Sequence, residues 1–284
     1  MKRYFYALSA ALLFSSLCFA ASPTNSHHSI ERTRTSTFHK EHHSQLPTPN
    51  SPNGHDTLDV VILGDSNTYN GGDDCTDERG WNTWFKRIFG PRSCKSYARS
   101  GATWTNTRAT VADTKEKIDI IGNNNVIYNQ INRLKQAHRS GGQPTPHLIL
   151  ICAGTNDAWF TKYRPAAYDM TASQAFADSR QFITRRNVST VLTLAESVRY
   201  GCEMLIEAFP NAQIVLITPP QCTKVDAGKM LKTGDIIEQC GNYMSIGVVR
   251  LDKVGAIYGV RELQHTHATA AGVIIPPGPN APIR

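Results

Sequence analysis

The 284-residue sequence lacks several features that would point directly to a function. Beyond its first 20 residues it has no apolar run of the roughly 20 residues that cross a bilayer, so no membrane-spanning segment is expected after them. It also has no compact cluster of lysine and arginine with interleaved aromatic residues. A nucleic acid is therefore not the expected partner, and the formal net charge of +7 favours a mildly basic surface that attracts acidic polymers.

The cysteines have no metal-binding pattern. None of them forms a CxxC pair, so a zinc site built from cysteine is not predicted, and we expect no metal and no cofactor. Cys152 lies in an apolar strand pattern and Cys202 in a helical pattern, which is typical of buried free thiols. If the protein is exported, signal cleavage removes Cys18 and leaves six of the seven cysteines, which can form disulfides in fifteen possible sets of three pairs. The candidates for local pairs are Cys75 with Cys94 and Cys222 with Cys240.

The N-terminal segment has the composition of a secretory signal peptide. Two basic residues precede a short apolar stretch at residues 7–17, and small residues follow at Ala20 and Ala21. We predict a signal peptide over residues 1–21 that is cut near Ala20 or Ala21. The mature protein is then secreted or periplasmic.

Residues 22–57 lack large apolar residues and any periodicity. They are rich in Ser, Thr, Asn, Pro and His, which predicts a disordered linker. Six of the ten histidines fall here, and we interpret them as a solvated tail, with metal binding by the tail as the alternative. Four histidines remain for the body of the protein, namely His138, His147, His265 and His267.

From residue 58 onward, apolar runs alternate with amphipathic stretches. Apolar runs predict strands at residues 58–63, 95–98, 147–153, 212–218 and 247–252. Helical spacing predicts helices at residues 81–89, 126–138 and 188–209. Continuous apolar strands separated by helices are typical of a parallel sheet covered on both faces. We therefore predict one α/β domain over residues 58–284, a three-layer α/β/α sandwich, and a monomer.

Polar clusters follow the predicted strands. In open parallel sheets, ligands bind beyond the carboxyl ends of the strands. The first predicted strand ends at Gly-Asp-Ser-Asn, residues 64–67, the second is followed by Ser100-Gly101, and the third ends at Gly-Thr-Asn-Asp, residues 154–157. A fourth polar segment, HTHATAAG, begins at His265.

This ordered set of motifs resembles the SGNH hydrolases, also called GDSL-type esterases. Residues 64–67 match the family's nucleophile block, Gly101 falls at the glycine of its second block, and residues 154–157 match its GxND block. Residues 267–272 are similar to the HPNxxG block that supplies the catalytic histidine. The resemblance covers residues 58–272, and it implies a flavodoxin-like fold and ester hydrolysis.

The resemblance assigns roles that fit the chemistry of acyl transfer, which needs a nucleophile, a base and donors for an oxyanion. Ser66 is the implied nucleophile and His267 the implied base. The backbone N–H groups of Ser66 and Gly101 and the side-chain amide of Asn156 are the implied oxyanion donors. Glycine at position 101 lets the backbone approach the substrate without a Cβ.

Two aspartates stand beside these residues. Asp65 is adjacent to Ser66, and neighbouring side chains at such a turn point apart, so we expect Asp65 to hydrogen-bond the turn rather than serve as the triad acid. We interpret Asp157 in the same way. Trp104 and Trp159 lie close to the catalytic blocks, and either pocket lining or core packing fits them.

The sequence departs from the family pattern in two places. The family carries Asp three residues before its histidine, whereas this chain has Gln264, whose carbonyl can orient His267 but brings no charge. Three interpretations stay open: a Ser–His dyad oriented by Gln264 or a backbone carbonyl, rescue by an acid such as Glu262 or Asp252, and a weakened or inactive enzyme. The prolines that follow Gly272 exclude the closing helix of the family.

These observations predict an exported serine esterase whose substrate is a small-molecule or polysaccharide ester. The expected acyl group is acetyl or another short chain, and the expected alcohol is a carbohydrate or a lipid. The alternative is a catalytically impaired SGNH-fold protein that binds a carbohydrate or a surface, and the glutamine at position 264 favours it.

Overall fold

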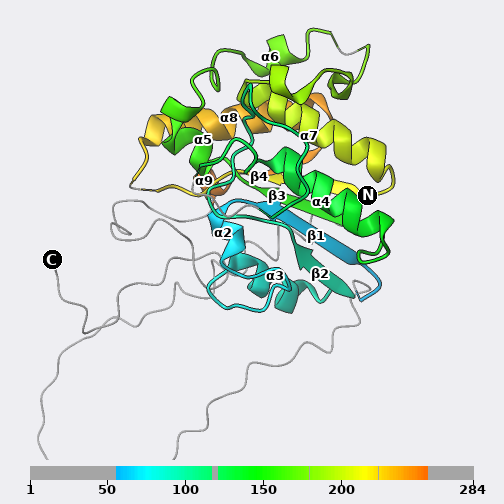
Figure 1. Ribbon diagram of the computed structural model, residues 1–284. Helices are drawn as coiled ribbons and strands as arrows, with labels where there is room; N and C mark the ends of the chain where they lie inside the picture. The colour runs from blue at the N-terminus through cyan, green and yellow to red at the C-terminus, as the bar shows by residue number, and fades with distance from the viewer. Residues whose placement is uncertain (1–55, 117–120, 179, 223, 255–284) are drawn as a thin grey trace, which may run out of the picture.

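The computed structural model describes residues 56–116, 121–178, 180–222 and 224–254. They form a five-stranded parallel sheet of order β2-β1-β3-β4-β5 with helices packed against it (Figure 1). The strands are β1 (Asp59–Gly64), β2 (Ser93–Ser96), β3 (Leu148–Cys152), β4 (Gln213–Ile217) and β5 (Gly247–Val249). The predicted α/β sandwich with a parallel sheet is confirmed, and its strand order is the flavodoxin-like one.

Helices connect the strands. The α-helices are α2 (Ser66–Tyr69), α3 (Trp81–Phe89), α4 (Ile127–Arg139), α5 (Thr155–Trp159), α6 (Ala172–Ala175), α7 (Leu194–Ala208), α8 (Ala227–Tyr243) and α9 (Leu251–Val254). Three 3₁₀ turns are η1 (Thr161–Tyr163), η2 (Ile183–Arg185) and η3 (Val188–Thr190). Within the described ranges, none of the helices combines the length and apolarity needed to cross a membrane.

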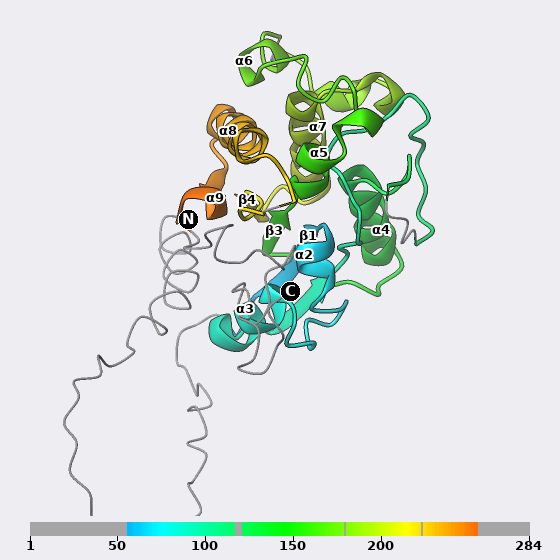
Figure 2. The ribbon, with the colours of Figure 1, turned by 90° about the vertical axis from the view of Figure 1, so that its left-hand side faces the viewer.

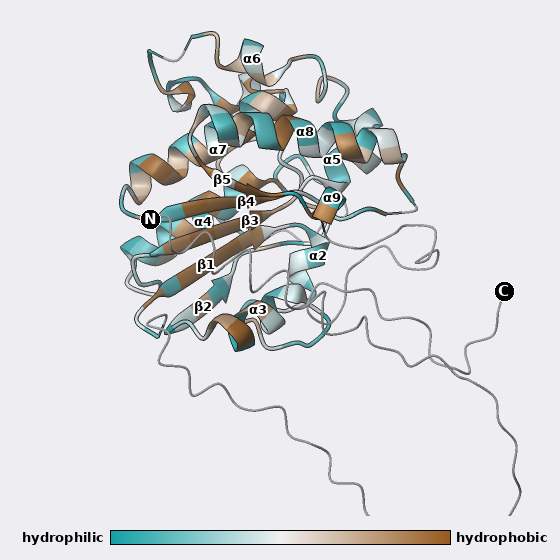
Figure 3. Ribbon diagram, turned by 180° about the vertical axis from the view of Figure 1, so that it is seen from behind, coloured by the Kyte–Doolittle hydropathy of each residue, from teal (hydrophilic) through white to brown (hydrophobic). Residues whose placement is uncertain are grey.

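The two faces of the sheet have separate cores because successive strand residues point to opposite sides. On one face, Val61 and Leu63 of β1 pack with apolar residues of α4, α7 and α8. On the other face, Val60 and Ile62 pack with the aromatic residues of α3. Figure 2 shows α4 and α7 on one side of the strands and α3 on the other. Figure 3 shows the α3 face, where the hydrophobic strands β1, β3 and β4 are in view.

The strand order places the site. β1 pairs in parallel with both β2 and β3, and Gly64 at the end of β1 lies opposite Cys152 at the end of β3. From β1 the chain moves outward to β2, and it then returns to form β3 on the opposite side of β1. The strand order therefore reverses between β1 and β3. In such sheets the crevice beyond this switch point is the usual ligand site. The segments after Gly64 and Cys152 therefore meet at one edge.

Several predicted elements differ from the structure: the strand predicted over residues 95–98 lies at Ser93–Ser96, and the short helices α2, α5, α6 and α9 were not predicted. The helix predicted over residues 188–209 is divided into η3 and α7, because the Thr193 side chain accepts from the Glu196 N–H in a capping box that starts α7 at Leu194. The strand predicted over residues 247–252 ends at Val249. Helix α8 was not predicted, since its three glycines reduce helix propensity.

The described cysteines are buried free thiols. The predicted pair Cys222 and Cys240 is not brought together, since the two residues belong to different hydrophobic clusters. The sulfurs of Cys75 and Cys94 are neighbours at 3.5 Å. Cys152 and Cys202 are buried thiols, as predicted.

Candidate active site

The first polar block turns the chain at the end of β1. Asp65 is the N-cap of α2, and its Oδ1 accepts a hydrogen bond from the Asn67 backbone N–H at 3.0 Å. This cap makes Ser66 the first residue of the helix, where it is half-buried. Only glycine fits at position 64, because a Cβ there would lie 2.4 Å from the Cys152 carbonyl oxygen.

The end of β1 is fixed by a glutamine that the sequence analysis did not identify. Gln130 of α4 accepts from the Gly64 N–H through Oε1 at 2.9 Å and donates from Nε2 to the Gly64 carbonyl at 2.7 Å. The Asp65 N–H donates to the Cys152 carbonyl at 3.2 Å. These bonds fix Gly64 and Asp65, the two residues that precede Ser66.

Asp65 is a buried carboxyl group with uneven partners. Its Oδ1 accepts from the backbone and side-chain N–H groups of Asn67, whereas its buried Oδ2 has no hydrogen-bond partner among the residues that the structure describes. Burial raises the pKa of Asp65 to about 6, and the two bonds from Asn67 oppose that shift. Asn67 Nδ2 also donates to Thr155 Oγ1 at 3.2 Å. Asn67 therefore links the first block to the block after β3.

The second block contains a glycine in a left-handed conformation. Gly101 has a φ of 78°, which favours glycine over residues with a Cβ. It is buried, and the next residue, Ala102, donates its N–H to the Arg99 carbonyl at 3.2 Å. The Asn125 side chain donates to the Ser100 carbonyl at 2.6 Å. The predicted requirement for glycine at position 101 therefore has a conformational basis.

The third block brings its asparagine to the Gly101 loop. Asn156 is buried on α5, and its Nδ2 donates to the Ala102 carbonyl at 2.8 Å. An amide NH₂ group carries two donors, and this bond uses one of them. Asn156 is thus hydrogen-bonded to the residue that follows Gly101, which brings two of the sequence-predicted oxyanion donors close together.

Asp157 holds the loop that follows Gly101. Its Oδ2 accepts from the Trp104 N–H at 3.0 Å, and its Oδ1 accepts from the N–H and the hydroxyl of Thr105 at 2.9 and 2.5 Å. Burial raises the pKa of Asp157, and the Thr105 and Trp104 donors and the Arg164 charge oppose the shift. The buried Arg164 donates from Nε to the Thr105 carbonyl at 2.8 Å. Neither Thr105 nor Arg164 was identified from the sequence.

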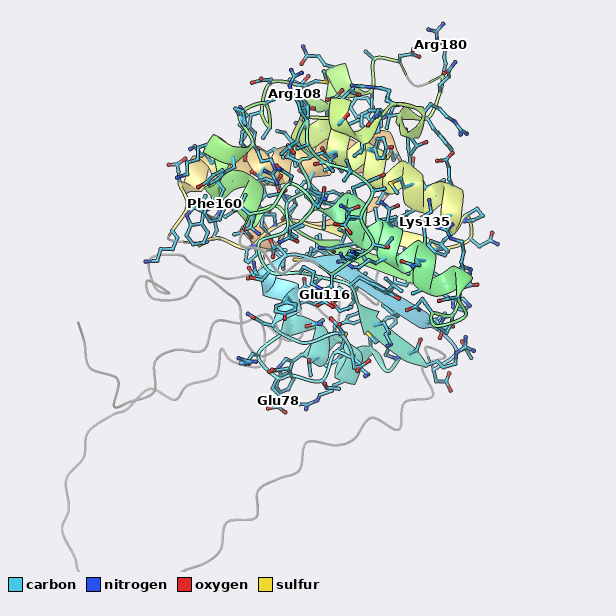
Figure 4. The ribbon with its side chains drawn as sticks, in the orientation of Figure 1. Glu78, Arg108, Glu116, Lys135, Phe160 and Arg180 are labelled. Atoms are coloured by element: carbon cyan, nitrogen blue, oxygen red, sulfur yellow. The ribbon has the colours of Figure 1, made fainter. Side chains whose placement is uncertain are left out.

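The two tryptophans occupy different environments. Trp104 is buried and donates from Nε1 to the Ala153 carbonyl at 3.3 Å, so it belongs to the core. Trp159 at the end of α5 is 38% exposed and stacks on Phe160 with ring centroids 5.0 Å apart. Tyr163 continues this aromatic group, which we call the α5 aromatic cluster, at 6.4 Å from Phe160. Figure 4 shows Phe160 on the outside of the molecule beside α5.

The predicted base and its neighbours at residues 262–267 lie outside the described residues. The two histidines within the described ranges are not near the three blocks in sequence or in contacts. His147 Nδ1 accepts from the Asp59 N–H at 3.1 Å, at the amino end of β1, and His138 Nδ1 contacts the Gln143 carbonyl. The described chain also contains no group of three or more metal-ligating side chains suited to a metal ion.

Asp252 was one of the acids considered for rescue of the triad. It is buried on α9, just after β5, and forms an ion pair with Arg250 at 2.5 Å. Its Oδ1 also accepts from the Thr218 hydroxyl at 2.5 Å. The charge of Asp252 is therefore already paired inside the protein.

Comparisons with known proteins agree with the order of the blocks. Residues 62–256 match the model of the GDSL-like lipase/acylhydrolase family. The match contains the blocks at residues 64–67, 101 and 154–157, and it ends before residues 267–272. No curated protein matches the chain.

Solved structures with a similar fold include two from bacteria. A GDSL-like lipase from Bacteroides ovatus has 18% sequence identity and a TM-score of 0.47, covering 76% of this chain and 92% of that one. The lipase/acylhydrolase from Enterococcus faecalis has 17% identity and a TM-score of 0.40, covering 76% of this chain and 86% of that one.

Proposed function

Because the chain belongs to the GDSL-like lipase/acylhydrolase family, we propose that it is an exported serine ester hydrolase with Ser66 as its nucleophile. The observation that carries the proposal is the convergence of three blocks at one edge of the sheet. Asn67 bonds Thr155, and Asn156 bonds the carbonyl of Ala102. These contacts join the segments that carry the nucleophile and the oxyanion donors.

In the proposed reaction, the Ser66 hydroxyl attacks the ester carbonyl and loses its proton to His267. The backbone N–H groups of Ser66 and Gly101 and the second N–H of the Asn156 amide stabilise the oxyanion. His267 then protonates the leaving alcohol, and water hydrolyses the acyl-enzyme with the same histidine as base. Gln264 orients the imidazole through its carbonyl and contributes no charge.

The substrate class follows from the surface near the third block. The exposed Trp159 and its neighbours in the α5 aromatic cluster follow Asn156 directly in the chain, and such rings suit a sugar or an acyl chain. The net charge of +7 favours an acidic polymer over a neutral one. We therefore favour an acetyl or short acyl ester of a carbohydrate, with a lipid ester as the second choice.

A fluorophosphonate probe together with p-nitrophenyl acetate tests the proposal. Wild type should be labelled and hydrolyse the ester, whereas Ser66→Ala should do neither. Ser173→Ala, at an exposed serine on α6, is the matched control and should behave as wild type. Labelling that persists in Ser66→Ala would exclude Ser66 as the nucleophile.

Position 264 separates an active enzyme from the alternative, a binding protein that keeps the fold. Gln264→Asp should raise kcat, because a carboxylate stabilises the imidazolium that forms in the transition state. The gain should vanish in a His267→Ala background. If wild type and Gln264→Asp are both inert toward acetyl esters and the probe, the binding protein is the better assignment. The ion pair between Asp252 and Arg250 favours the binding protein in one respect. It engages a carboxylate that could otherwise replace the aspartate that the family carries at the position of Gln264.

A further inference from the structure

Two buried thiols face each other between the loop that follows α2, the helix that begins at Ser66, and the edge strand β2. Cys75 is in the loop between α2 and α3, and Cys94 is on the edge strand β2. The two sulfur atoms are 3.5 Å apart, and the residues are only 1% and 4% exposed. This contact singles out Cys75 and Cys94 as a pair and leaves three of the fifteen connectivities that the six cysteines allow.

The loop that carries Cys75 is already docked on β2. The Ser96 N–H donates to the Asp73 carbonyl at 2.7 Å, and Lys95 forms an ion pair with Asp74 at 3.4 Å. Cys75 has a φ of 53°, an uncommon value for a residue with a Cβ, and the backbone turns sharply there. The two backbones thus hold the sulfurs in contact without a covalent bond. Figure 4 shows Glu78 of the same loop on the outside of the molecule, near α3.

We propose that Cys75 and Cys94 form a disulfide that fastens the loop after the nucleophile helix to the edge strand. The sulfurs must approach from 3.5 Å to about 2.05 Å, which small side-chain rotations can supply. The bond closes a ring of about 20 residues that contains α3, so it restricts the unfolded chain to fewer conformations. The proposal is independent of the esterase function, and it requires only that the protein fold in an oxidising compartment.

The oxidation is a thiol–disulfide exchange with a small or protein disulfide, such as oxidised glutathione. The Cys75 thiolate attacks the oxidant and releases one of its thiols, and the Cys94 sulfur then displaces the second, so two protons and two electrons leave the pair. Because both thiols are buried, the exchange occurs before the loop has packed.

Peptide mapping of the mature chain, which has lost Cys18 with the signal peptide, tests the pairing directly. The protein is folded in a glutathione redox buffer, denatured, alkylated without reductant and digested with trypsin. We expect a peptide containing Cys75 joined to one containing Cys94, which separate after reduction, and four cysteines alkylated as free thiols. Six alkylated thiols, or a bond from Cys75 to another cysteine, would overturn the proposal.

Thermal unfolding supplies a second measurement. Reduction should lower the Tm of the wild type by about 5–10 °C, the shift expected when a ring of this size is opened in a domain of this length. Cys75→Ser and Cys94→Ser should each lose this response to reductant. Cys202→Ser, at a buried thiol on α7, is the matched control and should keep it. A reductant response that survives in Cys94→Ser would contradict the proposal, and the wild-type peptide map remains decisive if a variant fails to fold.

Discussion

The blocks at residues 64–67 and 154–157 are built alike and behave differently. Each begins with a glycine at the end of a central strand and continues into a short helix, and each contains a buried aspartate. In the first block the aspartate precedes the helix and caps it. In the second the aspartate is inside the first turn, and the N-cap is Gly154, whose φ is 130° and whose cap makes no side-chain hydrogen bond.

The difference lies in how completely each carboxylate is bonded. Asp157 accepts three hydrogen bonds on its two oxygens, and all three come from the loop after Gly101. Asp65 accepts from the backbone and side-chain N–H groups of Asn67 on Oδ1, and the Thr155 side chain also lowers its pKa. Its Oδ2 is buried without a hydrogen-bond partner among the described residues. A fully bonded carboxylate fixes a neighbouring loop, whereas a half-bonded one stores an electrostatic cost. Four predictions within these blocks test this contrast and the roles proposed for them.

The largest effect is expected at Ser66 in the first block. Ser66→Ala should lower kcat/KM for a short-chain aryl ester by about 10³ or more, since no other group supplies the nucleophile. The midpoint of thermal unfolding should stay close to that of wild type. Esterase assays and circular dichroism on the same preparation measure both quantities, and an active variant would contradict the serine mechanism.

In the block at residues 154–157, Asn156→Ala should lower kcat by about 10²–10³, the loss seen when one oxyanion donor is removed, with a smaller change in KM. Asn156→Asp is the matched control, because it keeps the shape of the side chain and removes its donors. It should be at least as slow as the alanine variant. An unchanged kcat in Asn156→Ala would remove this amide from the oxyanion site.

Much of the sheet could be predicted because each strand is marked by a local pattern in the sequence. The continuous apolar runs that form β1, β3 and β4 are buried on both faces of the sheet. Such runs indicate parallel strands without any information from distant residues. The shifted boundaries arise where another local signal overrides periodicity, as the Thr193 cap does at α7. Helix α8 escaped prediction because Gly234 is required by a tertiary contact: a Cβ there would lie 2.7 Å from Asp252 Oδ2.

The site was predictable to a smaller extent. Motif order predicted roles for Ser66, Gly101 and Asn156, and hydrogen bonds join the segments that carry them. The roles themselves stay predictions. The supporting residues could not be found this way, because their roles depend on contacts across many residues of sequence. Gln130 reaches Gly64 across 66 residues, and Arg164 reaches Thr105 across 59. A glutamine in a polar helix gives no sign in the sequence that it will replace ladder hydrogen bonds at a strand end.

Asp157, the fully bonded carboxylate of the block at residues 154–157, should contribute more to stability than Asp65. Asp157→Ala leaves two backbone N–H groups and the Thr105 hydroxyl buried without an acceptor, and it deprives Arg164 of a nearby negative charge. The expected loss of unfolding free energy is about 3–5 kcal/mol. Asp65→Ala is the matched comparison and should lose only about 1–2 kcal/mol, the usual value of an N-cap. Urea denaturation at pH 7 measures both, and equal losses would contradict the contrast.

The smallest effect is a pH dependence that comes from the half-bonded carboxylate. Burial raises the pKa of Asp65 to about 6, above its ordinary value of 3.8. Between these values the folded protein binds a proton that the unfolded chain does not, so this group stabilises the fold most at low pH. The contribution is lost as the pH rises toward 6 and beyond. Integrated from pH 4.5 to pH 7.5, it amounts to about 2 kcal/mol.

Asp65→Asn should remove this dependence, because the amide has the same shape and does not titrate. Groups with lowered pKa, such as Asp59 and Asp77, destabilise the fold in acid, so the total curve of either protein need not slope in one direction. They are common to both proteins and cancel in the difference. The unfolding free energy of wild type minus that of Asp65→Asn, measured in urea at pH 4.5 and pH 7.5, should therefore fall by about 2 kcal/mol as the pH rises. A difference that is flat, or that rises, would mean that Asp65 is stabilised as the charged form. The proposed contrast between Asp65 and Asp157 would then be wrong, because the oxygen Asp65 Oδ2 would not carry the expected electrostatic cost.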